Sequence, residues 1–136
     1  MLDPENVPEI SDDEVVARYI LQSNEFRKND NTVKPTLFLP YSKIELSVNR
    51  HTCCNEDEIW QFGTNVATAR NKTLHGRSDI AASACNAVTP LRVVAKPIIP
   101  DNPNHADVIN YPESKEDQLA LAQKLAASAS KRIEAP

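Results

Sequence analysis

Three histidines and two arginines are of the residue types that acid–base chemistry on an anionic substrate requires. Arg50 precedes His51 directly, Arg77 follows His75 by two positions, and His105 lies further along the chain. In metal-independent nucleases and phosphotransfer enzymes, His moves protons and Arg holds the negatively charged transition state. Each of these residues falls on a predicted loop or at the end of a predicted element. The sequence therefore offers all five as candidate catalytic residues, on condition that their loops converge.

His105 is the strongest of these candidates because of the loop around it. The predicted loop over residues 96–112 contains four prolines, and a stiff loop loses less entropy when it holds a polar group in place. In an enzyme, we expect His105 to act as general acid or base, with Arg50 or Arg77 holding the anion. In an interaction protein, His105 would instead fix the loop by hydrogen bonding to backbone carbonyls.

The side chains that could bind zinc or act as a thiol nucleophile are spaced poorly for either role. The potential zinc ligands are His51, His75, His105, Cys53, Cys54 and Cys85. They form no C-x-x-C and no H-x-x-x-H pair, so we expect neither a metal nor another cofactor. Cys53 and Cys54 precede a predicted helix N-terminus, which favours a thiolate, but three acidic residues at 56–58 oppose it. We therefore expect reduced cysteines that pack as small apolar residues.

Composition limits the classes of protein to which this chain can belong. A chain of 136 residues with 40% hydrophobic and 25% charged residues suits one globular domain. We expect an extended N-terminal arm over residues 1–10 and a single domain over 11–136. The net charge of −4 argues against non-specific binding to DNA. The acidic start resembles no signal peptide and no apolar run is long enough to span a membrane, so we expect no membrane contact and a cytoplasmic location.

The stretch 44–70 should form the centre of the fold. Ile44, Leu46 and Val48 alternate with polar residues, which predicts a strand over 44–48. Asn55 is a good N-cap, acidic residues follow it, and apolar residues then recur at helical spacing. This pattern predicts a helix over 55–70. Trp60 flanks the apolar stripe and should be largely buried because of its large area.

Shorter signals predict the remaining elements. The capping-box pattern from Ser11 to Glu14 predicts a helix over 12–22, and Ser114 predicts the start of a last helix over 115–132. The run 36–39 between two prolines reads as an edge strand or an extended entry segment, turned by residues 41–43 into the central strand. Further strands are expected over 91–95 and 106–109. Residues 79–89 favour a buried strand, although their Ala content also allows a helix.

This order of elements predicts a fold class. The elements run α-β-β-α-β-β-α, with a short additional strand at 106–109, which is typical of a two-layer α+β domain with an antiparallel or mixed sheet. A helix at 79–87 would instead give a mostly helical fold with a small hairpin.

One segment resembles a known group of proteins. Residues 102–109 read N-P-N-H-A-D-V-I, and they are followed by Tyr111-Pro112 and by Lys115 and Gln118 in an Ala-rich helix. This is similar to a family of small uncharacterised bacterial proteins with an N-P-x-H-A-x-(I/V) loop, an aromatic-Pro pair and a helix bearing Lys and Gln. The resemblance extends to L-S-V-x-R at 46–50 and D-E-I-W at 57–60, and Tyr111 stands where the family has Trp. The family has no assigned activity, so the resemblance implies none.

Because no catalytic motif is specific, the sequence favours a small intracellular accessory or protein-interaction component of a larger assembly. The acidic, Pro-containing arm and the Ala-rich C-terminal helix offer surface to a protein partner or to a second copy of the chain. The alternative is a small metal-independent nuclease or phosphotransfer enzyme. The two hypotheses differ in whether the loops that carry His51, His75 and His105 meet.

Overall fold

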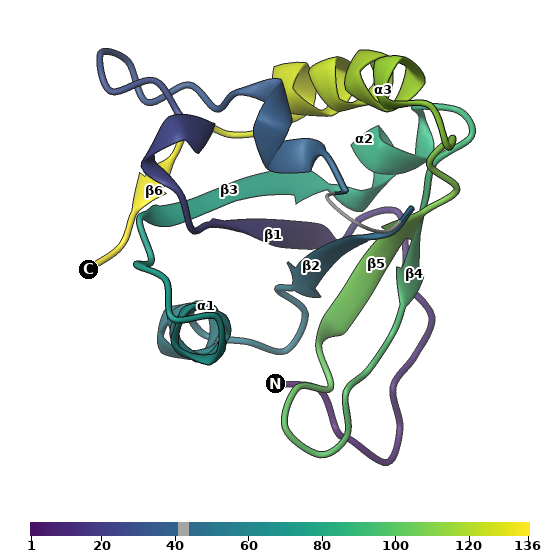
Figure 1. The fold of residues 1–136 in the computed structure, drawn as a ribbon. Coiled ribbons are helices and arrows are strands. Elements are labelled where there is room, and N and C mark those ends of the chain that lie inside the picture. The colour runs from purple at the N-terminus through teal and green to yellow at the C-terminus, as the bar shows by residue number, and fades with distance from the viewer. Residues whose placement is uncertain (41–43) are drawn as a thin grey trace.

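The protein, described by a computed structural model over residues 1–40 and 44–136, is built on one antiparallel sheet with strand order β4-β5-β2-β1-β3-β6 (Figure 1). Its strands are β1 (Val15–Ile20), β2 (Leu46–Arg50), β3 (Gly76–Ala81), β4 (Arg92–Ala95), β5 (His105–Ile109) and β6 (Ile133–Glu134). Its helices are α1 (Glu56–Ala69), α2 (Ala82–Asn86) and α3 (Lys115–Ser128), with short 3-10 helices η1 (Ser23–Glu25) and η2 (Pro35–Phe38). The predicted α+β class is confirmed.

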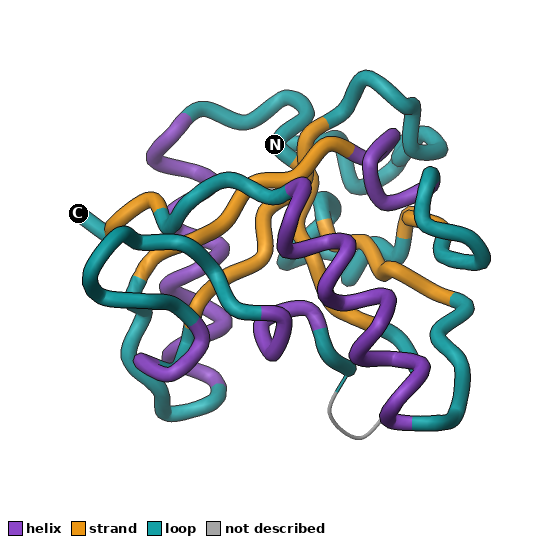
Figure 2. The backbone as a smooth tube through the Cα atoms, turned by 90° about the horizontal axis from the view of Figure 1, so that it is seen from above, coloured by secondary structure: helices purple, strands orange, loops and turns teal. Residues whose placement is uncertain are grey.

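The helices lie on both faces of the sheet. Figure 1 shows α1 on one side of the strands and α2 and α3 on the other, and Figure 2 looks down on α3 where it crosses the strands. The predicted two-layer arrangement is therefore not confirmed. Because successive strand residues point to opposite faces, strand β1 contributes side chains to both packed layers, with Val16 and Ile20 on one face and Ala17 and Tyr19 on the other.

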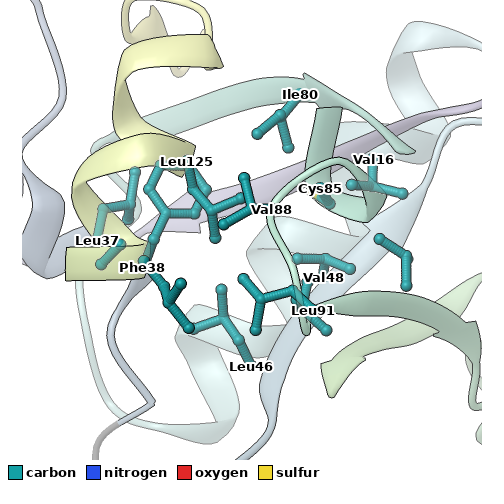
Figure 3. Packing of buried hydrophobic residues seen from close by; sticks show 14 of the residues in the cluster. Val16, Leu37, Phe38, Leu46, Val48, Ile80, Cys85, Val88, Leu91 and Leu125 are labelled. Carbon is teal, nitrogen blue, oxygen red and sulfur yellow. The ribbon is translucent and has the colours of Figure 1, made fainter. Parts of the chain in front are cut away.

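The main core fills the space between the sheet and the layer formed by η2, α2 and α3. Figure 3 shows its side chains meeting from all of these elements, among them Val16, Leu37, Phe38, Leu46, Val48, Ile80, Cys85, Val88, Leu91 and Leu125. Full burial of an aliphatic or aromatic side chain contributes about 1.5–3 kcal/mol to folding, so this layer supplies most of the stabilisation. On the opposite face, Ala17, Tyr19 and Phe62 form a smaller cluster under α1.

The helix α1 confirms the prediction for residues 55–70. The side chain of Asn55 accepts the backbone N–H of Glu58, and the Glu58 side chain accepts the N–H of Asn55. Ile59 and Phe62 are buried as the stripe requires. Trp60, expected to be largely buried, is only half-buried and lies against the guanidinium of Arg77.

The predicted helix over 12–22 is wrong, because this segment is strand β1. Only half of the expected capping box is present, because the Glu14 side chain accepts the Ser11 N–H but the Glu14 N–H donates to the Ser11 backbone carbonyl and not to its hydroxyl. Most of the six residues after Glu14 are β-branched or aromatic, however, and the segment pairs with β2 on one side and with β3 on the other. Pairing on two sides and burial on both faces outweigh the local cap.

Other boundaries differ from the predictions for physical reasons that can be identified. Residues 36–38 belong to η2 and Leu39 is its extended C-cap, because Pro35 pre-sets a helical turn and lacks the N–H that a strand ladder needs. The turn predicted at 41–43 lies outside the described residues. Strand β2 begins at Leu46, and Ile44 is 49% exposed. Residues 79–89 are divided between β3 and α2, so both interpretations hold in part.

The last helix ends at Ser128 and not at the predicted position 132. Beyond it, the N–H of Ser130 donates to the Asp79 carbonyl, and Ile133 and Glu134 pair with β3 as strand β6. Binding to the edge of the sheet therefore takes the place of the final helical turn. The strands predicted over 91–95 and 106–109 are present as β4 and β5.

Candidate functional site

A serine and a histidine meet on the sheet where β2 pairs with β5. Asn49 is the strand partner of His105, and the His105 ring turns toward Ser47 on the same face. Oγ of Ser47 lies 2.7 Å from Nε2 of His105, and Nδ1 of His105 lies 2.8 Å from the carbonyl oxygen of Lys96. A carbonyl oxygen can only accept, so Nδ1 carries the proton. In neutral His105, Nε2 is therefore free to accept the Ser47 hydroxyl.

Carboxylates lie beside this pair. Oδ1 of Asp107 is 3.8 Å from Nε2 of His105, and the side chains of both residues are mostly buried, with exposed fractions of 13% and 15%. Burial raises the pKa of Asp107, neighbouring Glu45 raises it further, and His105 acts against both. A positive charge that forms on His105 would be stabilised by the Asp107 carboxylate.

A small cleft adjoins Ser47 at the C-terminal end of α1. It has a volume of about 20 Å³ and is lined by Ser47, Asn49, Val66 and Arg70, among others. This is enough space for about one water-sized group. Among the described residues, the guanidinium of Arg70 takes part in no hydrogen bond or ion pair. A cation that is not neutralised thus lines the same cleft as the serine.

A second polar cluster links His51 to Arg77 through Asp79. Oδ1 of Asp79 lies 3.1 Å from Nε2 of His51 and 3.1 Å from Nε of Arg77. The ring of His51 is not aligned for a hydrogen bond, so this contact is chiefly electrostatic. Burial would raise the pKa of Asp79, but His51 and Arg77 outweigh it and hold that pKa below its ordinary value.

Arg77 is fully engaged within this cluster. Its Nη1 and Nη2 donate to the two carboxylate oxygens of Glu56 at 3.0 and 2.9 Å. The guanidinium carbon also lies 4.7 Å from the centre of the Trp60 ring, which is cation–π distance. With Asp79 on Nε, Arg77 has no free face on which to hold an anionic substrate.

Arg50 is buried and equally engaged. Nε and Nη2 donate to the two oxygens of Glu14 at 2.8 and 2.9 Å, and Nη1 donates to the Pro8 carbonyl at 2.7 Å. These bonds join the N-terminal arm to strands β1 and β2. An open groove of about 520 Å³ runs beside them, and its lining includes Glu9, Asp13 and Glu14. Its acidic walls do not favour an anion.

The loops of the three histidines do not meet at one point. The backbone N–H of His51 binds the Val15 carbonyl at the start of β1, whereas that of His75 binds the Ile20 carbonyl at its end. The His75 ring lies 6.1 Å from that of Phe26 and belongs to neither polar cluster. His105 is the first residue of β5 and not a loop residue. Of the five candidates, only His51 and Arg77 share a cluster, while His105 pairs with Ser47.

Sequence reasoning did not identify Ser47, Arg70 or Asn104. Ser47 and His105 are 58 positions apart, and only the register between β2 and β5 brings them together. Asn104 is completely buried, with Oδ1 accepting the Leu2 N–H and Nδ2 donating to the carbonyls of Arg50 and Thr52. The one feature of the sequence that could have drawn attention to Asn104 is its position between Pro103 and His105.

No protein-family model, curated protein or solved structure matches this chain. The resemblance of residues 102–118 to a bacterial family therefore stays a prediction. Within the described residues, no helix is both long and apolar enough to cross a membrane. Nor do any three His, Cys, Asp or Glu side chains in that part of the chain gather in a way that would hold a metal ion.

Proposed function

We propose that this chain is a small intracellular interaction component that anchors to another protein through the tip of its β4–β5 hairpin. The supporting observation is a pair of exposed isoleucines on a hydrogen-bonded tip. Ile98 and Ile99 are 51% and 54% exposed. Exposed apolar side chains are ordinary when scattered singly, but two adjacent ones at a projecting tip are typical of an anchor for a partner.

The hairpin holds these side chains in place before any partner binds. Ile98 and Asn102 exchange two backbone hydrogen bonds at 2.9 and 2.7 Å, and Lys96 N–H donates to the His105 carbonyl at 3.0 Å. Pro97 and Pro100 flank the two isoleucines and restrict the backbone. Figure 1 shows this connection projecting beyond the sheet. A rigid anchor loses little entropy on binding, which raises its contribution to affinity.

The partner that fits best is a different protein with an apolar pocket. Burial of the exposed halves of two isoleucines would contribute about 2–3 kcal/mol to binding. A tip of one copy docking into a groove of another is a head-to-tail contact, which tends to form open chains and not closed dimers. The engagement of Arg50 and Arg77 with carboxylates favours this proposal over the phosphotransfer hypothesis, in which one of these arginines holds an anion.

The proposal is tested with the double variant Ile98→Asp, Ile99→Asp. Ile44, 49% exposed at the opposite end of the sheet, supplies the matched control Ile44→Asp. A photoreactive residue at position 99, introduced in the source cells, should yield one discrete adduct whose partner is then identified and purified. We expect the double variant to weaken binding to that partner at least tenfold, whereas the control Ile44→Asp should bind as tightly as the wild type. The melting temperatures of both variants should be the same as that of the wild type.

Two results would contradict this function. One is an adduct pattern at position 99 that is the same as that at position 44. The other is a wild-type chain that assembles with itself in light scattering and loses this assembly in the double variant, which would assign the tip to a second copy of the chain.

A further inference from the structure

We propose that Ser47 and His105 form a nucleophile–base pair that cleaves carboxylic esters with a small acyl group. The Ser47 hydroxyl donates to Nε2 of His105 at 2.7 Å, and the Lys96 carbonyl holds Nδ1 at 2.8 Å. A serine hydroxyl becomes nucleophilic when an imidazole is placed to take its proton and a third group fixes that imidazole. The Lys96 carbonyl is this third group, because it fixes the tautomer in which Nε2 faces Ser47 without a proton.

The surroundings support transfer of a proton to His105. The imidazolium that results lies close to Asp107, whose Oδ1 is 3.8 Å from Nε2. Because both side chains are mostly buried, water screens this attraction less than it would at the surface. The backbone around Ser47 is also fixed, since Nη1 of Arg18 donates to the Ser47 carbonyl at 2.9 Å.

The cleft next to Ser47 indicates the class of substrate. Its volume of about 20 Å³ holds about one water-sized group, such as the carbonyl oxygen of an ester, while the rest of a substrate would extend into solvent. Arg70 lines this cleft without a partner among the described residues, in contrast to Arg50 and Arg77. A free cation beside a nucleophile is placed to stabilise the oxyanion that forms when a carbonyl is attacked. We therefore assign Arg70 as the oxyanion-stabilising residue.

The reaction has two steps. In the first, Oγ of Ser47 bonds to the ester carbonyl carbon, its proton moves to Nε2 of His105, and the ester C–O bond breaks. The leaving alkoxide takes that proton and departs as an alcohol. In the second, His105 accepts a proton from water, the hydroxide attacks the acyl-serine, and Ser47 regains a proton as the carboxylic acid is released.

The experiment uses the full-length chain with a fluorophosphonate probe and with p-nitrophenyl acetate. We expect a covalent adduct that mass spectrometry assigns to Ser47, together with a burst of nitrophenol. Ser47→Ala should abolish both. His105→Gln should slow labelling about 100-fold, as loss of a general base does, and Arg70→Gln should slow it about tenfold. The exposed Ser128 in the same chain is the internal control for indiscriminate labelling.

Several outcomes would overturn this assignment. The assignment is wrong if a folded wild-type chain gains no adduct at Ser47, whatever the variants show. It is also wrong if Ser47 and Ser128 are labelled at equal rates. A His105→Gln variant that has a normal melting temperature and labels Ser47 as fast as the wild type would overturn it too. The hairpin variant Ile98→Asp, Ile99→Asp should label like the wild type, which separates this activity from the proposed interaction.

Discussion

Arg50 and Glu14 form a buried bidentate ion pair. Nε lies 2.8 Å from Oε1 and Nη2 lies 2.9 Å from Oε2, and the two side chains are 0% and 9% exposed. Burial would raise the pKa of Glu14, but hydrogen bonds from Arg50 and Thr52 outweigh it and lower that pKa. The pair joins the turn before β1 to the end of β2, so its role is structural.

Replacing Glu14 by Gln should destabilise the fold strongly. The change keeps the shape of the side chain but leaves the buried Arg50 guanidinium without a countercharge, which typically costs about 3–5 kcal/mol. In a domain of this size, such a loss lowers the melting temperature by about 10 °C or more. Glu9→Gln removes the same charge from an exposed neighbouring position and should leave the melting temperature within about 1 °C of the wild type. Equal melting temperatures for the two variants would refute the structural role.

The element that sequence reasoning predicted most fully, helix α1, is one fixed by local contacts. Helix α1 has its own cap at Asn55, acidic residues in its first turn and an apolar stripe within fourteen residues. Strand β1 was mistaken for a helix because its local signal, the turn from Ser11 to Glu14, is genuine, while its state is decided by β2 and β3. Such pairings depend on segments that are distant in the sequence and leave no local pattern.

The same distinction applies to the candidate site. Arg77 and Asp79 are two positions apart, so their ion pair follows directly once β3 is known to be a strand. The contact between Ser47 and His105 requires the register between β2 and β5, which alternation alone does not determine. His105 was identified by its residue type and surroundings, but its partner could be found only in three dimensions.

Asn104→Ala should cost about 2–4 kcal/mol of stability. The Asn104 side chain is fully buried and satisfies the Leu2 N–H and the carbonyls of Arg50 and Thr52, so its removal leaves several buried polar groups without partners. Asn104→Asp keeps the acceptor for Leu2 but loses the Nδ2 donor and should be at least as destabilising. Urea unfolding measures both changes. If the Asp variant were as stable as the wild type, the hydrogen bonds donated by Nδ2 would contribute nothing to stability.

Gly76→Ala should be much more damaging than most surface changes to alanine. Gly76 has φ of +148°, a conformation open to glycine, and a Cβ there would lie 2.4 Å from the carbonyl oxygen of Ile133. Strand β6 would have to separate from β3, so protection of its backbone amides from hydrogen exchange should fall. Gly63→Ala is the comparison, because its Cβ would meet the Tyr19 ring at 2.7 Å and overpack α1 instead, at a cost of about 1–3 kcal/mol. Retained protection of β6 in the Gly76 variant would contradict this account.

The Asp79 carboxylate should make stability depend on pH in the acidic range. His51 and Arg77 hold its native pKa below the value of about 3.9 that an unfolded chain has, despite the opposing effect of burial. The native state therefore favours the ionised form, and this contribution is complete above the unfolded pKa and disappears as the pH falls through the native one.

We expect Asp79→Asn to lower the free energy of unfolding by about 1–3 kcal/mol at pH 7, because the charge on the carboxylate that accepts from the buried Arg77 is lost. The difference from wild type should shrink steadily between about pH 4 and pH 2, since both chains then carry a neutral group at this position. Asp101→Asn, on the exposed hairpin tip, is the control and should show no such trend. Urea unfolding at pH 7, 5, 4, 3 and 2 measures the three curves. The opposite trend, in which the stability difference between Asp79→Asn and wild type grows as the pH falls, would contradict this prediction. It would show that the native state raises the Asp79 pKa.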